Sequence, residues 1–147
     1  MTLPRTPSQT VGPYYVIGLC RRPDDELEEG GVELHGTLFD GQGEPIGDGM
    51  IELWDARARR WGRSGTHPDG RFRFLVPRGS TTFEAYVFAR GLLRHQRTRI
   101  YVGDADDDVL TSLDAGERAT LLARSDSDGY RFDIHMQGES ATVFFEH

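Results

Sequence analysis

The stretch Thr82–Gly91 reads Thr-Phe-Glu-Ala-Tyr-Val-Phe-Ala-Arg-Gly. Successive side chains of an extended strand point to opposite faces, so one face carries Phe83, Ala85, Val87 and Ala89, and the other carries Glu84, Tyr86, Phe88 and Arg90. Both faces hold aromatic or branched groups, which predicts a strand that is covered on both sides. Because charge is rarely buried without a partner or a purpose, Glu84 and Arg90 require an explanation.

Further short strands, separated by turns rich in glycine and proline, surround this stretch. We expect them at Val32–Phe39, Met50–Asp55, Arg71–Val76, Thr98–Val102, Tyr130–Met136 and Ala141–Phe145. One helix is predicted over Leu110–Ala123, where leucines recur at helical spacing and Ser112 is a candidate N-cap. The pattern predicts a mainly β protein, a two-sheet β-sandwich with one short helix, formed by a single domain over 1–147.

Composition limits the classes of partner. The 147 residues hold 17 arginines, no lysine and 24 acidic residues, for a net charge of −7, which argues against nucleic acid or an anionic membrane as a partner.

No apolar run approaches the roughly 20 residues of a membrane span, and the N-terminus lacks the apolar segment of a signal peptide. The single cysteine, Cys20, excludes an internal disulfide and fits a reducing compartment, so we expect a cytoplasmic protein.

We predict that residues 1–23 form an extended N-terminal arm and that residues 24–31 form an acidic linker that ends in glycines. Two prolines and a Gly12-Pro13 turn keep the arm extended and free of helix. Its apolar run from Tyr14 to Leu19 is too rich in large side chains for a disordered tail. The arm therefore packs on a surface, either on its own domain or on a neighbouring chain.

Motifs for nucleotide binding or nucleophilic catalysis are absent from the sequence. The five histidines, at positions 35, 67, 95, 135 and 147, are scattered, and no two have the short spacing of a shared metal site. A site built from distant histidines stays open at this point.

Several segments together resemble one family, the intradiol ring-cleaving dioxygenases, and within it the alpha chains of the protocatechuate 3,4-dioxygenases. The similar segments are Thr6–Gly18, Gly36–Asp55, Phe88–Gly91 with Thr98–Tyr101, Tyr130–Glu139 and Thr142–Phe145. The chain looks shortened between the arm and the first strand, and again around 60–82.

The resemblance implies a complex of alpha and beta chains with similar β-sandwich folds. In such a complex the partner beta chain holds non-haem ferric iron through two tyrosines and two histidines. The family's His-x-His pair falls on the strand quoted above, where this sequence has Thr82 and Glu84. The resemblance therefore implies an iron-free alpha-type chain, which binds no cofactor itself and pairs with an iron-bearing beta chain in a higher oligomer of heterodimers.

The implied reaction is the opening of a dihydroxybenzoate ring by O2 to give a carboxymuconate. The alpha chain's implied part is one wall of the substrate pocket, formed here by Thr10, Gly12, Pro13, Tyr14 and Arg90. The planar, charged guanidinium of an arginine can pair with the carboxylate of an anionic benzoate. Arg90 has an alternative role in an ion pair with Glu84, and the two roles are compatible.

Two other functions remain open. The strand–turn–strand over Gly36–Trp54 also resembles small prealbumin-like sandwich modules with binding or structural roles, in which the arm folds onto its own core. A third possibility is an unaided metalloenzyme that uses His67, His95 or His135.

Overall fold

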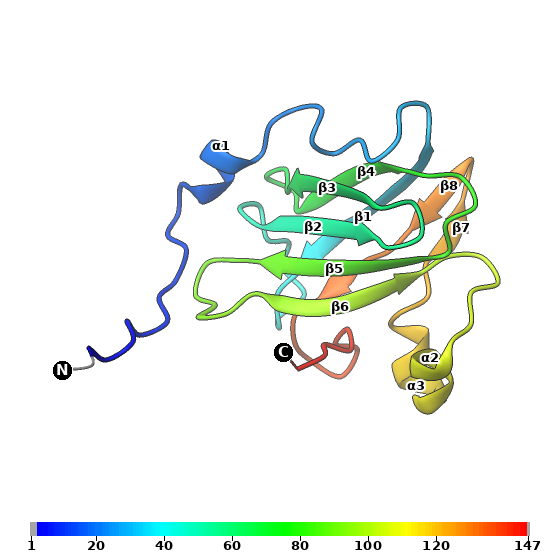
Figure 1. The fold of residues 1–147 in the computed structure, drawn as a ribbon. Coiled ribbons are helices and arrows are strands. Elements are labelled where there is room, and N and C mark those ends of the chain that lie inside the picture. Colours follow the sequence, from blue (N-terminus) through cyan, green and yellow to red (C-terminus); the bar gives the residue numbers. More distant parts are fainter. Residues whose placement is uncertain (1–2, 147) are drawn as a thin grey trace.

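The computed structural model of the protein describes residues 3–146. Two β-sheets packed face to face form its body (Figure 1). One sheet has the order β3 (Arg60–Gly65), β2 (Met50–Asp55), β5 (Thr82–Phe88) and β6 (Gln96–Tyr101). The other has the order β4 (Arg71–Val76), β1 (Val32–Phe39), β8 (Gly129–Arg131) and β7 (Arg124–Asp126), and β9 (Ile134–His135) also pairs with β1. The predicted two-sheet β-sandwich is confirmed.

The core lies between the sheets and follows the alternation of the strands. Phe83, Ala85 and Val87 of β5 are fully buried, and they belong to the same apolar cluster as Phe72 and Phe74 of β4. Each large side chain removed from water in this way contributes about 1.5–3 kcal/mol. The outer face of β5 is only partly covered, so the expectation that both faces are buried was wrong.

β1 approaches neighbouring backbone so closely that one position admits only glycine. A Cβ atom on Gly36 would lie 1.7 Å from the carbonyl oxygen of Phe132. Here β1 pairs with β4 on one side and, in parallel, with β8 and β9 on the other. Gly36 thus allows the C-terminal segment to close the second sheet.

The helical segment differs from the expectation of one helix over Leu110–Ala123. It forms two short helices, α2 (Asp108–Ser112) and α3 (Ala115–Ala119). Asp114 breaks the helix because its backbone is extended and its side chain caps α3 in a reciprocal pair with Glu117. The N-cap of α2 is Asp107, whereas Ser112 is the last residue of α2.

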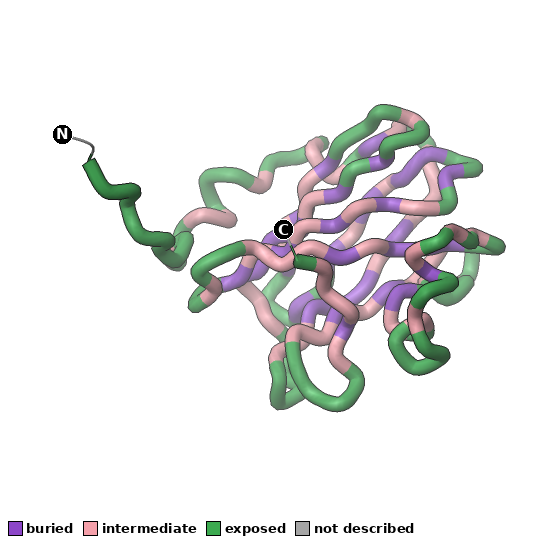
Figure 2. The backbone as a smooth tube through the Cα atoms, turned by 60° about the horizontal axis from the view of Figure 1, so that its bottom comes forward, coloured by how far each residue is buried: buried purple, intermediate pink, exposed green. Residues whose placement is uncertain are grey.

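The arm contains a third helix, α1 (Tyr15–Leu19), so the expectation of an arm free of helix was wrong over these five residues. Residues 3–11 are exposed and extend away from the sandwich (Figures 1 and 2). At the other end, the expected strand over Ala141–Phe145 is reduced to one bridge between Phe145 and Arg97. Within residues 3–146, no helix is long and apolar enough to cross a membrane.

Candidate functional site

The base of the N-terminal arm is fixed to the end of β5 by one hydroxyl group. The Tyr15 hydroxyl lies 2.8 Å from the carbonyl oxygen of Asp48 and 2.9 Å from that of Phe88, and it shares its proton between them. Burial, followed by the nearby charge of Asp48, raises the pKa of Tyr15 far above its usual value. The hydroxyl therefore remains a donor at any physiological pH. Together with the hydrogen bond of 3.1 Å that Arg63 Nη1 donates to the carbonyl oxygen of Leu19, it holds the base of the arm on the sandwich.

Arg90 lies beside the same anchor. Its guanidinium forms an ion pair with the Asp48 carboxylate, and 61% of its side chain stays exposed. The pairing with Glu84 considered above is not formed. β5 ends at Phe88, so the alternation that would place Arg90 on the face of Glu84 stops before Arg90 is reached.

The four predicted arm residues lie at the surface just ahead of this anchor. Thr10, Pro13 and Tyr14 are exposed, the last to 76%. Gly12 has φ +79°, a left-handed conformation that favours glycine, and it sets the direction of the chain before Pro13. These residues are free to contact another molecule.

A small apolar groove of about 390 Å³ separates the arm from the loop that follows β5. The arm contributes Gln9 and Val11, and the loop side includes Phe88, Leu92 and Leu93. The structure therefore brings the arm and the loop together, while Tyr14 and Arg90 lie outside the walls of the groove.

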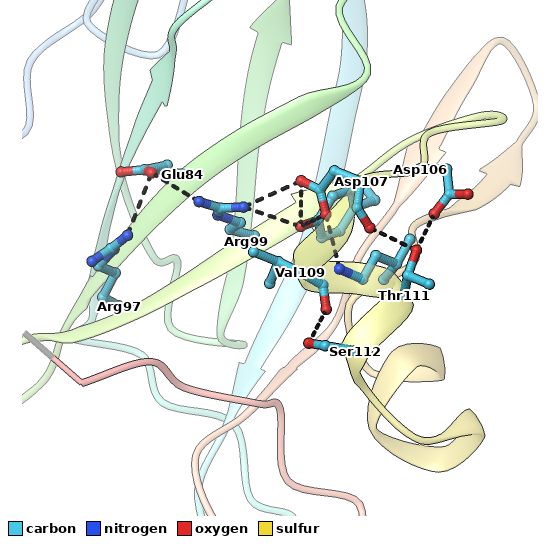
Figure 3. Close-up of polar contacts among 10 residues, drawn as sticks. Glu84, Arg97, Arg99, Asp106, Asp107, Val109, Thr111 and Ser112 are labelled. Carbon is cyan, nitrogen blue, oxygen red and sulfur yellow. Dashed lines mark hydrogen bonds and ion pairs between the residues drawn. The ribbon is translucent and has the colours of Figure 1, made fainter.

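Glu84, at one of the two positions where the resemblance places a metal ligand, is held by arginines (Figure 3). Its Oε1 lies 3.5 Å from Arg97 Nη2 and 3.7 Å from Arg99 Nη2. Its Oε2 accepts a hydrogen bond of 3.0 Å from the Tyr86 hydroxyl, whose pKa is raised by burial and then by this bond. All of these groups are half-buried on the outer face of β5 and β6.

The network continues from Arg99 to Asp107 at the start of α2 (Figure 3). Arg99 Nη1 lies 3.2 Å from Asp107 Oδ2, and the Tyr101 hydroxyl lies 3.0 Å from both carboxylate oxygens. Tyr101 is fully buried, which raises its pKa above the usual value. Asp107 Oδ1 also accepts from the backbone amide of Leu110 at 2.8 Å and so caps the helix. Asp107 thus joins β6 to α2.

The residues at Thr82 and Glu84 do not fit a ferric ion of the type that the resemblance implies. They provide one hydroxyl and one carboxylate in place of two imidazoles, and the carboxylate already faces two guanidinium groups. Over residues 3–146, no group of three or more His, Cys, Asp or Glu side chains is arranged to hold a metal ion. No step of a reaction is assigned to iron bound here.

The histidines considered for an unaided metal site lie apart. His95 packs against the rings of Tyr86 and Phe88, and His135 stacks on Phe39 with ring centres 4.9 Å apart. His67 lies in the turn before β4. The three histidines line separate pockets.

Sequence reasoning missed the groups that hold the site in place. These are Tyr15, Asp48, Arg97, Arg99 and Asp107. Two of them could be found only with the strand register, because β6 begins at Gln96 instead of Thr98 and its pairing with β5 places Arg99 opposite Glu84. Arg97, two residues earlier, then shares the face of Arg99.

No protein-family model matches the sequence. The chain is 35% identical to the protocatechuate 3,4-dioxygenase alpha chain of Burkholderia cepacia over an alignment of 196 residues, which covers 99% of this chain and 98% of that one. It is 32% identical to the protein of the same name from Pseudomonas putida over 198 residues, with 98% and 97% covered. Since this chain has 147 residues, about 50 positions of the first alignment hold no residue of it.

Among solved structures, the fold is similar to the dioxygenase domain of a dioxygenase–carbohydrate-binding fusion protein from Streptomyces sp. SirexAA-E. The TM-score is 0.56 at 24% identity, and the match covers 90% of this chain and 98% of that one. This likeness supports the fold alone. The two sequence matches extend over nearly the whole length of both partners, and the chain therefore belongs to the protocatechuate 3,4-dioxygenase alpha chains of the intradiol ring-cleaving dioxygenase family.

Proposed function

We propose that this chain is the iron-free alpha subunit of an intradiol dioxygenase complex, in which a partner beta chain holds the ferric iron. The observation that carries the proposal is the state of Glu84, whose carboxylate faces Arg97 and Arg99 where an iron-bearing chain needs a histidine. The names of the two curated relatives, both alpha chains, support it. The complex opens the ring of a dihydroxybenzoate with O2 to give a carboxymuconate, and the isolated chain is inactive.

The proposed role of the chain is to build one wall of the substrate pocket. Thr10, Gly12, Pro13 and Tyr14 form an arm segment that is anchored at its base and exposed along its length. A proline next to a glycine gives a rigid backbone edge against a flat ring, and a tyrosine can stack on that ring or donate a hydrogen bond to it.

Arg90 supplies the charge in this wall. One side of its guanidinium meets Asp48, and the exposed remainder of its five donors is available to a carboxylate. The Asp48 pair restrains the side chain before a ligand arrives, which lowers the entropy cost of binding. Arg90 therefore orients the benzoate carboxylate and takes no part in breaking the ring.

The beta chain is proposed to dock on the arm and on the loop after β5. These two segments expose large apolar side chains, namely Val11, Tyr14, Ile17, Leu19 and Leu93, all at least 43% exposed. An exposed apolar surface of this kind marks an interface more often than a bare face of a monomer. An oligomer of such heterodimers would cover the arm of every copy.

The test is steady-state kinetics of 3,4-dihydroxybenzoate cleavage by the chain co-expressed with an iron-bearing beta chain of this family. Arg90→Gln and Tyr14→Ala should each raise KM about 5- to 30-fold, since each removes an interaction of about 1–2 kcal/mol with substrate. Arg78→Gln, at another exposed arginine in a turn, is the matched control and should leave KM unchanged. Unchanged KM values for both Arg90→Gln and Tyr14→Ala would contradict the pocket-wall role.

A further inference from the structure

A second cleft, of about 310 Å³, lies on the outer face of the β3-β2-β5-β6 sheet beside Glu84. Its walls include Trp54 of β2, Arg57 of the following turn, Thr82 of β5 and Arg99 of β6. The strand register places Trp54 opposite Glu84, and Glu84 opposite Arg99. An indole, a carboxylate and a guanidinium therefore lie in one row across three strands.

The charges around this cleft leave arginine donors available. Glu84 already receives Arg97 and Arg99 on one oxygen and the Tyr86 hydroxyl on the other. Arg57 is exposed, and its one hydrogen bond within residues 3–146 runs from Nη1 to the carbonyl oxygen of Gly79. Its remaining donors face no carboxylate of the described chain, so they are available to an anion that enters the cleft.

The opposite wall is aromatic. Trp54 is 37% exposed, although β2 is an inner strand of its sheet, and Trp61 lies directly across from it on β3. An indole face that is left in solvent next to arginines is a surface on which a flat ring can stack. The cleft lies at the small end of the range for ligand pockets, about 300–1,000 Å³, which suits a single ring with one charged substituent.

We propose that this cleft binds an aromatic carboxylate of the benzoate class, with its ring on Trp54 and its carboxylate on Arg57. The ligand chemistry follows from the indole and the Arg57 guanidinium, since the terminal nitrogens of Arg99 already face Glu84 and Asp107. It needs neither the arm, nor Arg90, nor a partner's iron. The position of a lost metal ligand has thus become part of a site for an organic anion.

The experiment uses the full chain alone, so its outcome does not depend on the proposed partnership. Trp61→Phe leaves Trp54 as the only tryptophan, and its fluorescence is titrated with sodium benzoate, sodium acetate and sodium sulfate. Benzoate should cause a saturable change, whereas acetate and sulfate should bind at least about tenfold more weakly. Benzoate line broadening in NMR spectra of the unsubstituted chain repeats the measurement without the Trp61 change.

Arg57→Gln in the Trp61→Phe background should weaken benzoate binding at least about tenfold, as expected when a charged hydrogen-bond donor is lost. Arg59→Gln, in the same turn but outside the cleft, removes an equal charge and should change the affinity less than about twofold, because exposed charges at a distance are screened. Three results would overturn the proposal: no saturable response to benzoate by either method, equal effects of the two arginine variants, or equal affinity for benzoate and acetate.

Discussion

Asp107 links a buried tyrosine, an arginine and a helix start, so replacing it by alanine should destabilise the fold by several independent routes. Loss of the N-cap of α2 costs about 1 kcal/mol. The Tyr101 hydroxyl, buried with its ring, loses its carboxylate acceptor, which costs about 1–3 kcal/mol. The pair with Arg99 is partly solvated and adds little, about 0–1 kcal/mol. We therefore expect Asp107→Ala to lower the free energy of unfolding by about 2–5 kcal/mol.

Asp107→Asn is the matched control. An asparagine oxygen in the place of Oδ1 can cap α2 and accept from Tyr101, and only the ion pair and hydrogen bond between Oδ2 and Arg99 are lost. This variant should cost no more than about 1 kcal/mol. The assay is urea denaturation followed by far-ultraviolet circular dichroism. In a thermal melt, Asp107→Ala should lower Tm by about 6–16 °C for a chain of this length.

A double-mutant cycle separates the tyrosine contribution. Tyr101→Phe removes the hydroxyl that Asp107→Ala leaves without an acceptor. The loss of unfolding free energy in the double variant should therefore be smaller than the sum of the two single losses by about 1 kcal/mol or more. The reasoning is refuted if Asp107→Ala costs less than about 0.5 kcal/mol, or if it costs the same as Asp107→Asn.

Three further predictions concern other parts of the fold. Gly36→Ala should prevent folding or cost more than about 4 kcal/mol in a denaturation assay, because its Cβ would meet the Phe132 carbonyl oxygen; wild-type stability would contradict the placement of the C-terminal segment. Glu33 accepts a hydrogen bond from Arg73, which lowers its pKa below the usual 4.5. Its contribution to stability is therefore present above pH 4.5 and is lost as the pH falls through the lowered folded-state pKa. Glu33→Gln should flatten the fall in stability between neutral pH and about pH 3, and an unchanged slope would count against this pair. Tyr15→Phe should loosen the base of the arm, seen as faster trypsin cleavage after Arg21 at equal global stability, whereas an unchanged rate of cleavage after Arg21 would show that the hydroxyl is not needed to anchor the arm.

Local patterning was enough to predict the sandwich. Strands such as β4 and β5 alternate buried and partly exposed residues along their length, and this period of two can be read directly from the sequence. The pattern could not show that the outer face of β5 is half open, because coverage depends on which elements pack there. The sequence indicated only in part that the predicted helix is divided into α2 and α3. The leucine spacing predicted Leu110–Ala123, but Asp114 prefers an extended capping conformation to the interior of a helix.

In the candidate site, too, the sequence could indicate individual residues but not the contacts between segments that lie far apart in the chain. The resemblance singled out Arg90 and the arm, and the structure places the base of the arm beside Arg90 through Tyr15 and Asp48. Arg90 could not be paired from the sequence, since Asp48 lies 42 residues earlier and enters through a turn. Glu84 was noted as an unexplained charge, and its partner Arg99 follows only from the pairing register of two strands.

The central claim is that this chain contributes a pocket wall to an enzyme whose iron belongs to a partner. The direct measurement is iron content and O2 consumption with 3,4-dihydroxybenzoate, for the purified chain alone and for the chain co-expressed with an iron-bearing beta chain of the family. We expect no stoichiometric iron and no ring cleavage for the chain alone, and a stable complex with about one iron for each pair of chains when the partner is present. Stoichiometric iron with ring cleavage in the isolated chain would contradict it.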